Sequence, residues 1–245
     1  MVIKQVKQWF VARANAARWK AVAEWADDRG AQFKLSRDAR GFVVEHQRHQ
    51  GNLRIEWGPS QRSYIDGYEL RIRAEARLNS ELQMLVLDKT LMERLEKEVF
   101  EAYTDTLRTR VDTDTPEEMR WLVMFPKLRH IASKLVRQHF GVLGVNQELP
   151  TIWLDGLLSD LLAQASQDLL AQGRPFVLMC QRGNVYLRCA MNQVVLADIQ
   201  QLLKLAEVAV QESQRVNVRL QDGGPWPTTT SVAWQTRPPE ADVPF

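Results

Sequence analysis

The most regular pattern in the chain is a strict alternation of apolar and charged residues in the segment YELRIRAEAR, positions 68–77. One set of positions carries Tyr68, Leu70, Ile72, Ala74 and Ala76, and the other carries Glu69, Arg71, Arg73, Glu75 and Arg77. A period of two places successive side chains on opposite faces of a strand. The segment is therefore predicted to be a strand with one face on a core and the other in water.

The same period extends over residues 32–88 and predicts an antiparallel meander of four or five strands. Residues 53–57 alternate in the same way, and Gly51-Asn52 suits a two-residue turn between strands at 42–49 and 53–57. Residues 82–87, LQMLVL, are apolar on both sides and predict a more central strand.

Apolar residues with helical spacing predict helices on both sides of this meander. The predicted helices cover 3–29, 89–104, a segment from Thr115 to Pro126, 127–140, 151–172 and 193–213. Thr115, Pro116 and Glu118 match a capping box with proline at the first helical position. Gly30 is expected just past the end of the first helix, and Pro126 is expected to break the third.

A second, shorter hairpin is predicted at 176–190, with its turn at Gly183-Asn184. The chain thus divides into two blocks, 1–113 and 114–220, each running helix, antiparallel strands, helix. Residues 221–245 are rich in proline and glycine and predict an irregular or disordered tail. The expected fold class is α+β, an antiparallel sheet with helices mainly on one face. Whether the strands of both blocks share one sheet is left open.

Charge and composition favour a cytoplasmic, soluble protein. The 245 residues include 32 basic and 30 acidic ones, a formal net charge of +2, so any site for an anionic partner must be local. The N-terminal segment lacks the apolar core of a signal peptide, and no window reaches the ~20 apolar residues of a membrane span. Cys180 and Cys189 are too few for a disulfide scaffold.

No motif predicts a catalytic residue, a metal site or a cofactor. His46 and His49 would point to opposite faces of a strand, and His130 and His139 are nine residues apart, so neither pair has metal-ligand spacing. The two cysteines flank the second hairpin and are interpreted as buried thiols, with their mutual contact depending on the loop length. Asp155 is interpreted as a first-turn residue of the helix at 151–172.

Two basic stretches are candidate contact surfaces. Residues 1–20 contain five cations and no acid, interleaved with Trp9, Phe10 and Trp19, which fits either an interfacial helix or a helix docked on the sheet. Between Glu118 and Glu148 there is again no acid. The basic residues there are Arg120, Lys127, Arg129, Lys134 and Arg137. They form either a patch for an anionic partner or a solvated face balanced by acids from 93–98.

The third candidate is the tail, where Trp226 and Trp234 stand among prolines and either fold back or bind a partner. The leading hypothesis is a non-enzymatic protein-interaction or adaptor protein, whose partner is another protein or a second copy of the chain. The alternative is a peripheral binder of an anionic surface, acidic lipid or nucleic acid, through 1–20 and 119–140. An enzyme whose site assembles from scattered residues is the third hypothesis.

Overall fold

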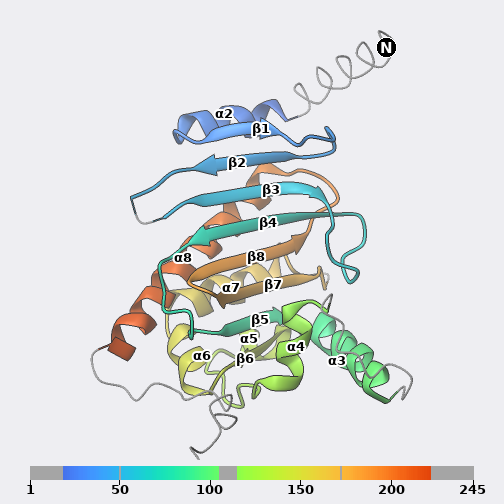
Figure 1. The fold of residues 1–245 in the computed structure, drawn as a ribbon, viewed down its shortest axis with the longest axis vertical. Coiled ribbons are helices and arrows are strands. Elements are labelled where there is room, and N and C mark those ends of the chain that lie inside the picture. The colour runs from blue at the N-terminus through green and yellow to red at the C-terminus, as the bar shows by residue number, and fades with distance from the viewer. Residues whose placement is uncertain (1–18, 50, 105–114, 172, 222–245) are drawn as a thin grey trace, which may run out of the picture.

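The computed structural model describes residues 19–49, 51–104, 115–171 and 173–221, which form an α+β fold around one antiparallel sheet (Figure 1). The described strands are β1 (Gln32–Leu35), β2 (Phe42–His46), β3 (Leu53–Pro59), β4 (Tyr68–Glu75), β5 (Met84–Asp88), β6 (Phe140–Gly144), β7 (Phe176–Gln181) and β8 (Asn184–Ala190). Their spatial order is β1-β2-β3-β4-β8-β7-β5-β6, and the sheet is not closed. The predicted class is confirmed, with more strands than expected.

The helices divide unequally between the two faces of the sheet. They are α2 (Lys20–Asp28), α3 (Lys89–Thr104), α4 (Glu117–Met124), α5 (Lys134–His139), α6 (Glu148–Trp153), α7 (Leu157–Gln167) and α8 (Leu196–Gln221). The larger core joins α2 and α5 to α8 to one face, and α8 runs behind the sheet in Figure 1. The smaller core packs α3 and α4 on the opposite face, over β5, β6 and β7. The helices are thus mainly on one face, as predicted.

Strands from both sequence blocks meet at the centre of this sheet. β4 pairs with β8, with Ile72 opposite Leu187, while β5 leaves the meander and lies between β7 and β6. The meander therefore has four strands. All five residues of β5 are buried, as the apolar run at 82–87 predicts for a strand with neighbours on both sides.

Both hairpin turns differ from the prediction because the apolar faces of the strands fix the register. Val44 lies opposite Ile55 and His46 opposite Leu53, so six residues, not two, connect β2 to β3. In the second hairpin the turn residues are Arg182 and Gly183, with φ of 48° and 78°, which suits a two-residue turn one position earlier than expected.

The helix predicted at 127–140 is mostly wrong, since the segment consists of a non-helical connector and a short helix, followed by a strand. Only Lys134–His139 is helical, and Phe140–Gly144 is the buried strand β6. Leu128 donates its backbone N–H to the Val142 carbonyl at 2.8 Å, so the connector from α4 runs along the outer edge of β6. A short apolar run does not distinguish a buried strand from a buried helix, which explains the error.

The other helices follow the prediction with changed limits. The single helix predicted at 151–172 is replaced by the end of α6 and the whole of α7, with Gly156 at a φ of 122° between them. Asp155 therefore lies between helices and not in a first turn. α3 spans 89–104 as predicted, α4 ends two residues before Pro126, and α8 continues to Gln221. Of the predicted helix at 3–29, residues 3–18 lie outside the described part of the chain, and so does the tail from 222.

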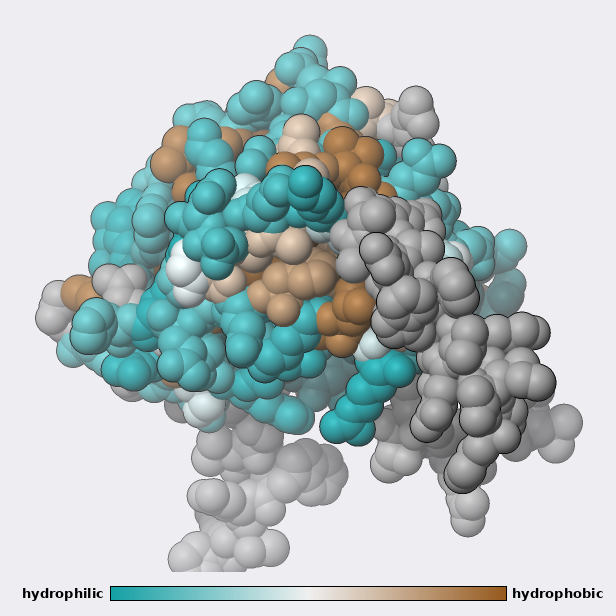
Figure 2. Space-filling model, turned by 90° about the horizontal axis from the view of Figure 1, so that it is seen from above, coloured by the Kyte–Doolittle hydropathy of each residue, from teal (hydrophilic) through white to brown (hydrophobic). Residues whose placement is uncertain are grey.

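The β1 end of the sheet carries an apolar patch. Figure 2 looks onto this end and shows apolar side chains surrounded by hydrophilic ones. The partly buried apolar residues there include Ala31, Phe33 and Leu35. β1 is an edge strand of four residues, and Lys34 is one of its two central residues. A short edge strand with a charged residue near its centre resists pairing with a further strand.

None of the described helices is both long and apolar enough to cross a membrane.

Asp88 caps α3. We expect two substitutions at this position to distinguish the effect of the capping hydrogen bond on stability from the effect of the buried charge. Its carboxylate accepts from the Leu91 backbone N–H at 2.9 Å, and desolvation by burial raises its pKa. Asp88→Ala should lower the free energy of unfolding by about 1 kcal/mol. Asp88→Asn keeps the acceptor and removes the buried charge, so at pH 7 it should be at least as stable as the wild type.

The pH dependence of this pair of variants follows from the same shift. Because the folded pKa lies above the unfolded one, the folded wild type gains stability as pH falls through the folded value. The advantage of Asp88→Asn should therefore shrink on acidification. Urea unfolding at several pH values measures it, and an advantage that grows towards acid would contradict the assignment.

The two cysteines are buried and unpaired, as the sequence suggests. Cys180 lies opposite Val185 and Cys189 opposite Phe176, so the pair sits at different levels of the hairpin. Burial raises the pKa of both thiols to about 12. We expect neither to react with a thiol reagent at pH 8 in the native protein, and both to react in denaturant. Rapid labelling of the folded chain, read by mass spectrometry, would contradict the burial.

Candidate functional site

The open face of the sheet, over β1 to β4 and β8, is charged but internally neutralised. Arg54 contacts both Glu45 and Glu56, and Arg71 reaches Glu56 at 3.1 Å. Lys34 completes the row with Glu45 at 2.7 Å, and these contacts lower the pKa of that carboxyl. Cross-strand ion pairs thus use most of the charge on this face.

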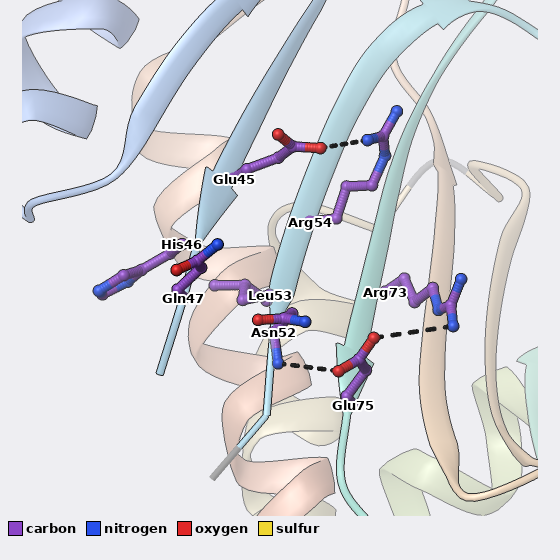
Figure 3. Close-up of a pocket in the computed structure, with 8 residues that line it drawn as sticks. All are labelled: Glu45, His46, Gln47, Asn52, Leu53, Arg54, Arg73 and Glu75. Carbon is purple, nitrogen blue, oxygen red and sulfur yellow. Dashed lines mark hydrogen bonds and ion pairs between the residues drawn. The ribbon is translucent and has the colours of Figure 1, made fainter. Parts of the chain in front are cut away.

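A hollow of about 250 Å³ opens where β2 and β4 end and β3 begins (Figure 3). It is lined by Glu45, His46, Gln47, Asn52, Leu53, Arg54, Arg73 and Glu75. Figure 3 shows that the charges pair with one another: Arg54 with Glu45, and Arg73 with Glu75 at 3.9 Å. A ligand would have to compete with these existing pairs.

The chemistry available in this hollow is limited. Burial, then the Arg48 guanidinium, lower the pKa of His46, and Arg48 donates to its Nδ1 at 3.2 Å, so the imidazole is neutral. In Figure 3 the His46 ring points away from the two carboxylates, so it is not paired with an acid there. Within the described ranges, no group of three or more histidine, cysteine or acidic side chains could hold a metal ion.

Glu69 is the first of two fully buried acids that the sequence did not reveal. The alternation in β4 places it on the water-facing side, but its side chain is 0% exposed. It accepts from Arg71 at 2.9 Å, from Arg188 at 2.8 Å and from the Gln61 backbone N–H at 2.9 Å, all on Oε1. The loop between β3 and β4 covers it, which period-two alternation cannot show.

Glu118 is the second buried acid, and it replaces the predicted capping box. α4 begins one residue later than expected, after Pro116, and no side chain caps it. Glu118 instead accepts from Arg62 Nε at 2.6 Å and from the Tyr64 hydroxyl. Burial, reinforced by the Glu118 carboxylate, raises the pKa of Tyr64, so the phenol keeps its proton and donates it.

Both acids hold the loop between β3 and β4 against the rest of the fold. Arg62 and Tyr64 connect this loop to α4, and Arg94 of α3 donates to the Tyr64 carbonyl at 2.6 Å. Each acid leaves its second oxygen buried without a hydrogen-bond partner. The network resembles an active site in its burial, but both carboxylates in it are ion-paired, Glu118 with Arg62 and Glu69 with Arg71 and Arg188. We therefore interpret it as structural.

The predicted basic stretch divides into paired and unpaired cations. Arg120 lies 3.4 Å from Glu117, and Lys127 lies 2.5 Å from Glu96, one of the acids expected to balance it. Three other cations are exposed and have no acidic partner among the residues that the structure describes. These are Arg129, Lys134 and Arg137.

Two exposed apolar side chains lie within the same stretch. Val123 is 54% exposed and Met124 is 68% exposed, at the C-terminal end of α4. The neighbouring Trp121 and Leu122 are buried against α3 and β5 to β7, so α4 is anchored while its outer side stays apolar. The sequence gives no sign of this, because helical spacing alone does not say which apolar residues are left outside.

The remaining predicted contact residues, Trp9, Phe10, Trp226 and Trp234, lie outside the described residues. Trp19, at the end of the N-terminal basic stretch, is buried in edge contact with Phe42 and Trp57.

No protein-family model matches the chain, and neither a search of curated proteins nor one of solved structures finds a match.

Proposed function

We propose that this chain is a non-enzymatic protein-interaction protein, and that α4 with the segment following it forms its binding surface. The observation that carries the proposal is the exposed pair Val123 and Met124, which we term the apolar pair, flanked by Arg120 and Lys127. Apolar side chains rimmed by charged ones are characteristic of protein contacts. Methionine adapts its shape to varied partners.

The alternatives to this surface are weaker. The charged side chains of the hollow in Figure 3 are already paired with one another. The buried acids Glu69 and Glu118 are already ion-paired with arginines of the same chain. The apolar pair, in contrast, belongs to a helix that is firmly packed through Trp121 and Leu122, so it is presented on a rigid base. A rigid base lowers the entropic cost of association.

The proposal includes a cytoplasmic location, since both thiols are buried and unpaired, as in proteins of a reducing compartment.

The proposal is tested by comparing two double variants of the tagged full chain in the cells that naturally make it. Val123→Ser/Met124→Ser removes the apolar pair, whereas Leu157→Ser/Val218→Ser removes two other exposed apolar side chains, one in α7 and one in α8. Partners are fixed by cross-linking and quantified by mass spectrometry. We expect a defined partner to fall at least about fivefold with the first variant only, since interface contacts of this kind are worth about 1 kcal/mol. If every captured protein responds equally to both variants, the proposal fails.

A further inference from the structure

A group of basic side chains follows the apolar pair in the chain. Arg129, Lys134 and Arg137 are exposed, as is His130, and within the described residues none of the four has an acidic partner. We term these four side chains the basic surface. The charged face of the sheet, in contrast, neutralises its arginines with Glu45, Glu56 and Glu69.

Helical spacing and one hydrogen bond bring α5 and the connector before it together. Lys134 and Arg137 are three residues apart in α5, so they lie on the same side of that helix. Arg137 Nη1 reaches back 3.4 Å to the carbonyl of Ile131, next to His130. The connector carrying Arg129 and His130 is therefore joined to α5 through this guanidinium.

The backbone beneath the basic surface is fixed. Val136 and Ile131 are buried in the larger core, and Leu128 is hydrogen-bonded to the edge of β6. The Ser133 hydroxyl caps α5 by accepting from the Val136 N–H at 3.4 Å. With its apolar positions held inward, this stretch exposes its cations, and no acidic side chain among the described residues pairs with them.

We propose that the basic surface binds an acidic segment of a partner protein, an inference that rests on the proposed function above. Carboxylates supply the charge that the three permanent cations lack, and the arginines can hold them in paired hydrogen bonds. The net charge of the whole chain is only +2, and its other large polar face is neutralised, so an extended polyanion would gain little outside this small area. The apolar pair, which precedes the basic surface by a few residues in the chain, suits a polypeptide with apolar and acidic residues.

The probe is a fluorescein-labelled peptide of twelve residues with alternating glutamate and leucine, titrated with the full chain and followed by anisotropy. Two triple variants change the net charge by the same amount. Arg129→Glu/Lys134→Glu/Arg137→Glu reverses the basic surface, and Arg37→Glu/Lys204→Glu/Arg219→Glu reverses three exposed cations elsewhere. The milder variant Arg129→Gln/Lys134→Gln/Arg137→Gln removes the charges without reversing them. Thermal unfolding of every variant shows whether it is folded.

We expect the first variant to weaken peptide binding at least about tenfold and the second less than about twofold, since attraction to a charged group falls off beyond the Debye length of about 10 Å at 0.1 M salt. The glutamine variant should fall between them. Equal losses of peptide affinity in both triple variants would show that only the net charge of the protein matters, and would overturn the inference. So would tighter binding of a labelled single-stranded DNA or of phosphatidylserine vesicles by the wild type. If cross-linking still depends on Val123 and Met124 but not on these cations, only this inference fails.

Discussion

Glu69→Ala is expected to lower the free energy of unfolding by about 3–5 kcal/mol, the usual cost of removing one partner from a buried ion pair. The side chain is 0% exposed and accepts three hydrogen bonds, two from Arg71 and Arg188 and one from the Gln61 backbone. Alanine would leave Arg188 without its ion-pair partner and Arg71 with Glu56 alone, and it would place these two guanidinium groups close together without the carboxylate between them. It would also release the loop between β3 and β4.

The control for Glu69 is Glu75→Ala in the same strand. The Glu75 side chain is 38% exposed and contacts the Asn52 backbone N–H at 3.2 Å and Arg73 at 3.9 Å, so its loss should change stability by about 1 kcal/mol or less. Denaturant unfolding of both variants decides the matter. Similar small losses for the two would mean that Glu69 is not held as described.

Glu118→Ala is the second large effect, also about 3–5 kcal/mol. This carboxylate is 1% exposed and accepts from both Arg62 and the Tyr64 hydroxyl, so alanine leaves the buried hydroxyl and the half-buried guanidinium without this acceptor. Because Tyr64 and Arg62 belong to the loop and Glu118 to α4, the contact between the meander and α4 should weaken first. Hydrogen exchange in 60–67 and 117–124 should rise more than in β7 and β8.

Tyr64→Phe provides a graded comparison for Glu118. It removes one donor and keeps the ion pair with Arg62, so a smaller loss of about 1–3 kcal/mol is expected. A loss equal to that of Glu118→Ala would show that the hydroxyl, and not the carboxylate, is the centre of the network.

The sequence predicts those features of the structure that are determined within one segment, and it misses those determined by contacts between distant segments. Alternation identifies β4 because its inner face, with Leu70 and Ile72, is set by the strand itself. β6 is missed because five apolar residues have no period that distinguishes strand from helix. Both turns are misplaced because the register comes from pairing across the sheet, as with Val44 and Ile55, and not from the turn residues.

The candidate sites show the same limit more sharply. The absence of acids between 118 and 148 is a local feature that can be read directly from the sequence. Glu69 and Glu118, in contrast, become buried only because the loop at 60–67 covers them, a contact between distant parts of the chain. The exposure of Val123 and Met124 likewise depends on how α4 packs against α3.

The central claim is that α4 binds another protein through its apolar pair, and site-specific photo-cross-linking tests it most directly. A photoreactive phenylalanine analogue is placed at Met124 and, as the control, at Val218 of α8, which is 53% exposed. In the cells that naturally make the protein, the analogue at position 124 should yield one defined adduct with a second protein that the analogue at 218 does not. No adduct at 124, or the same adducts at both positions, would contradict the account.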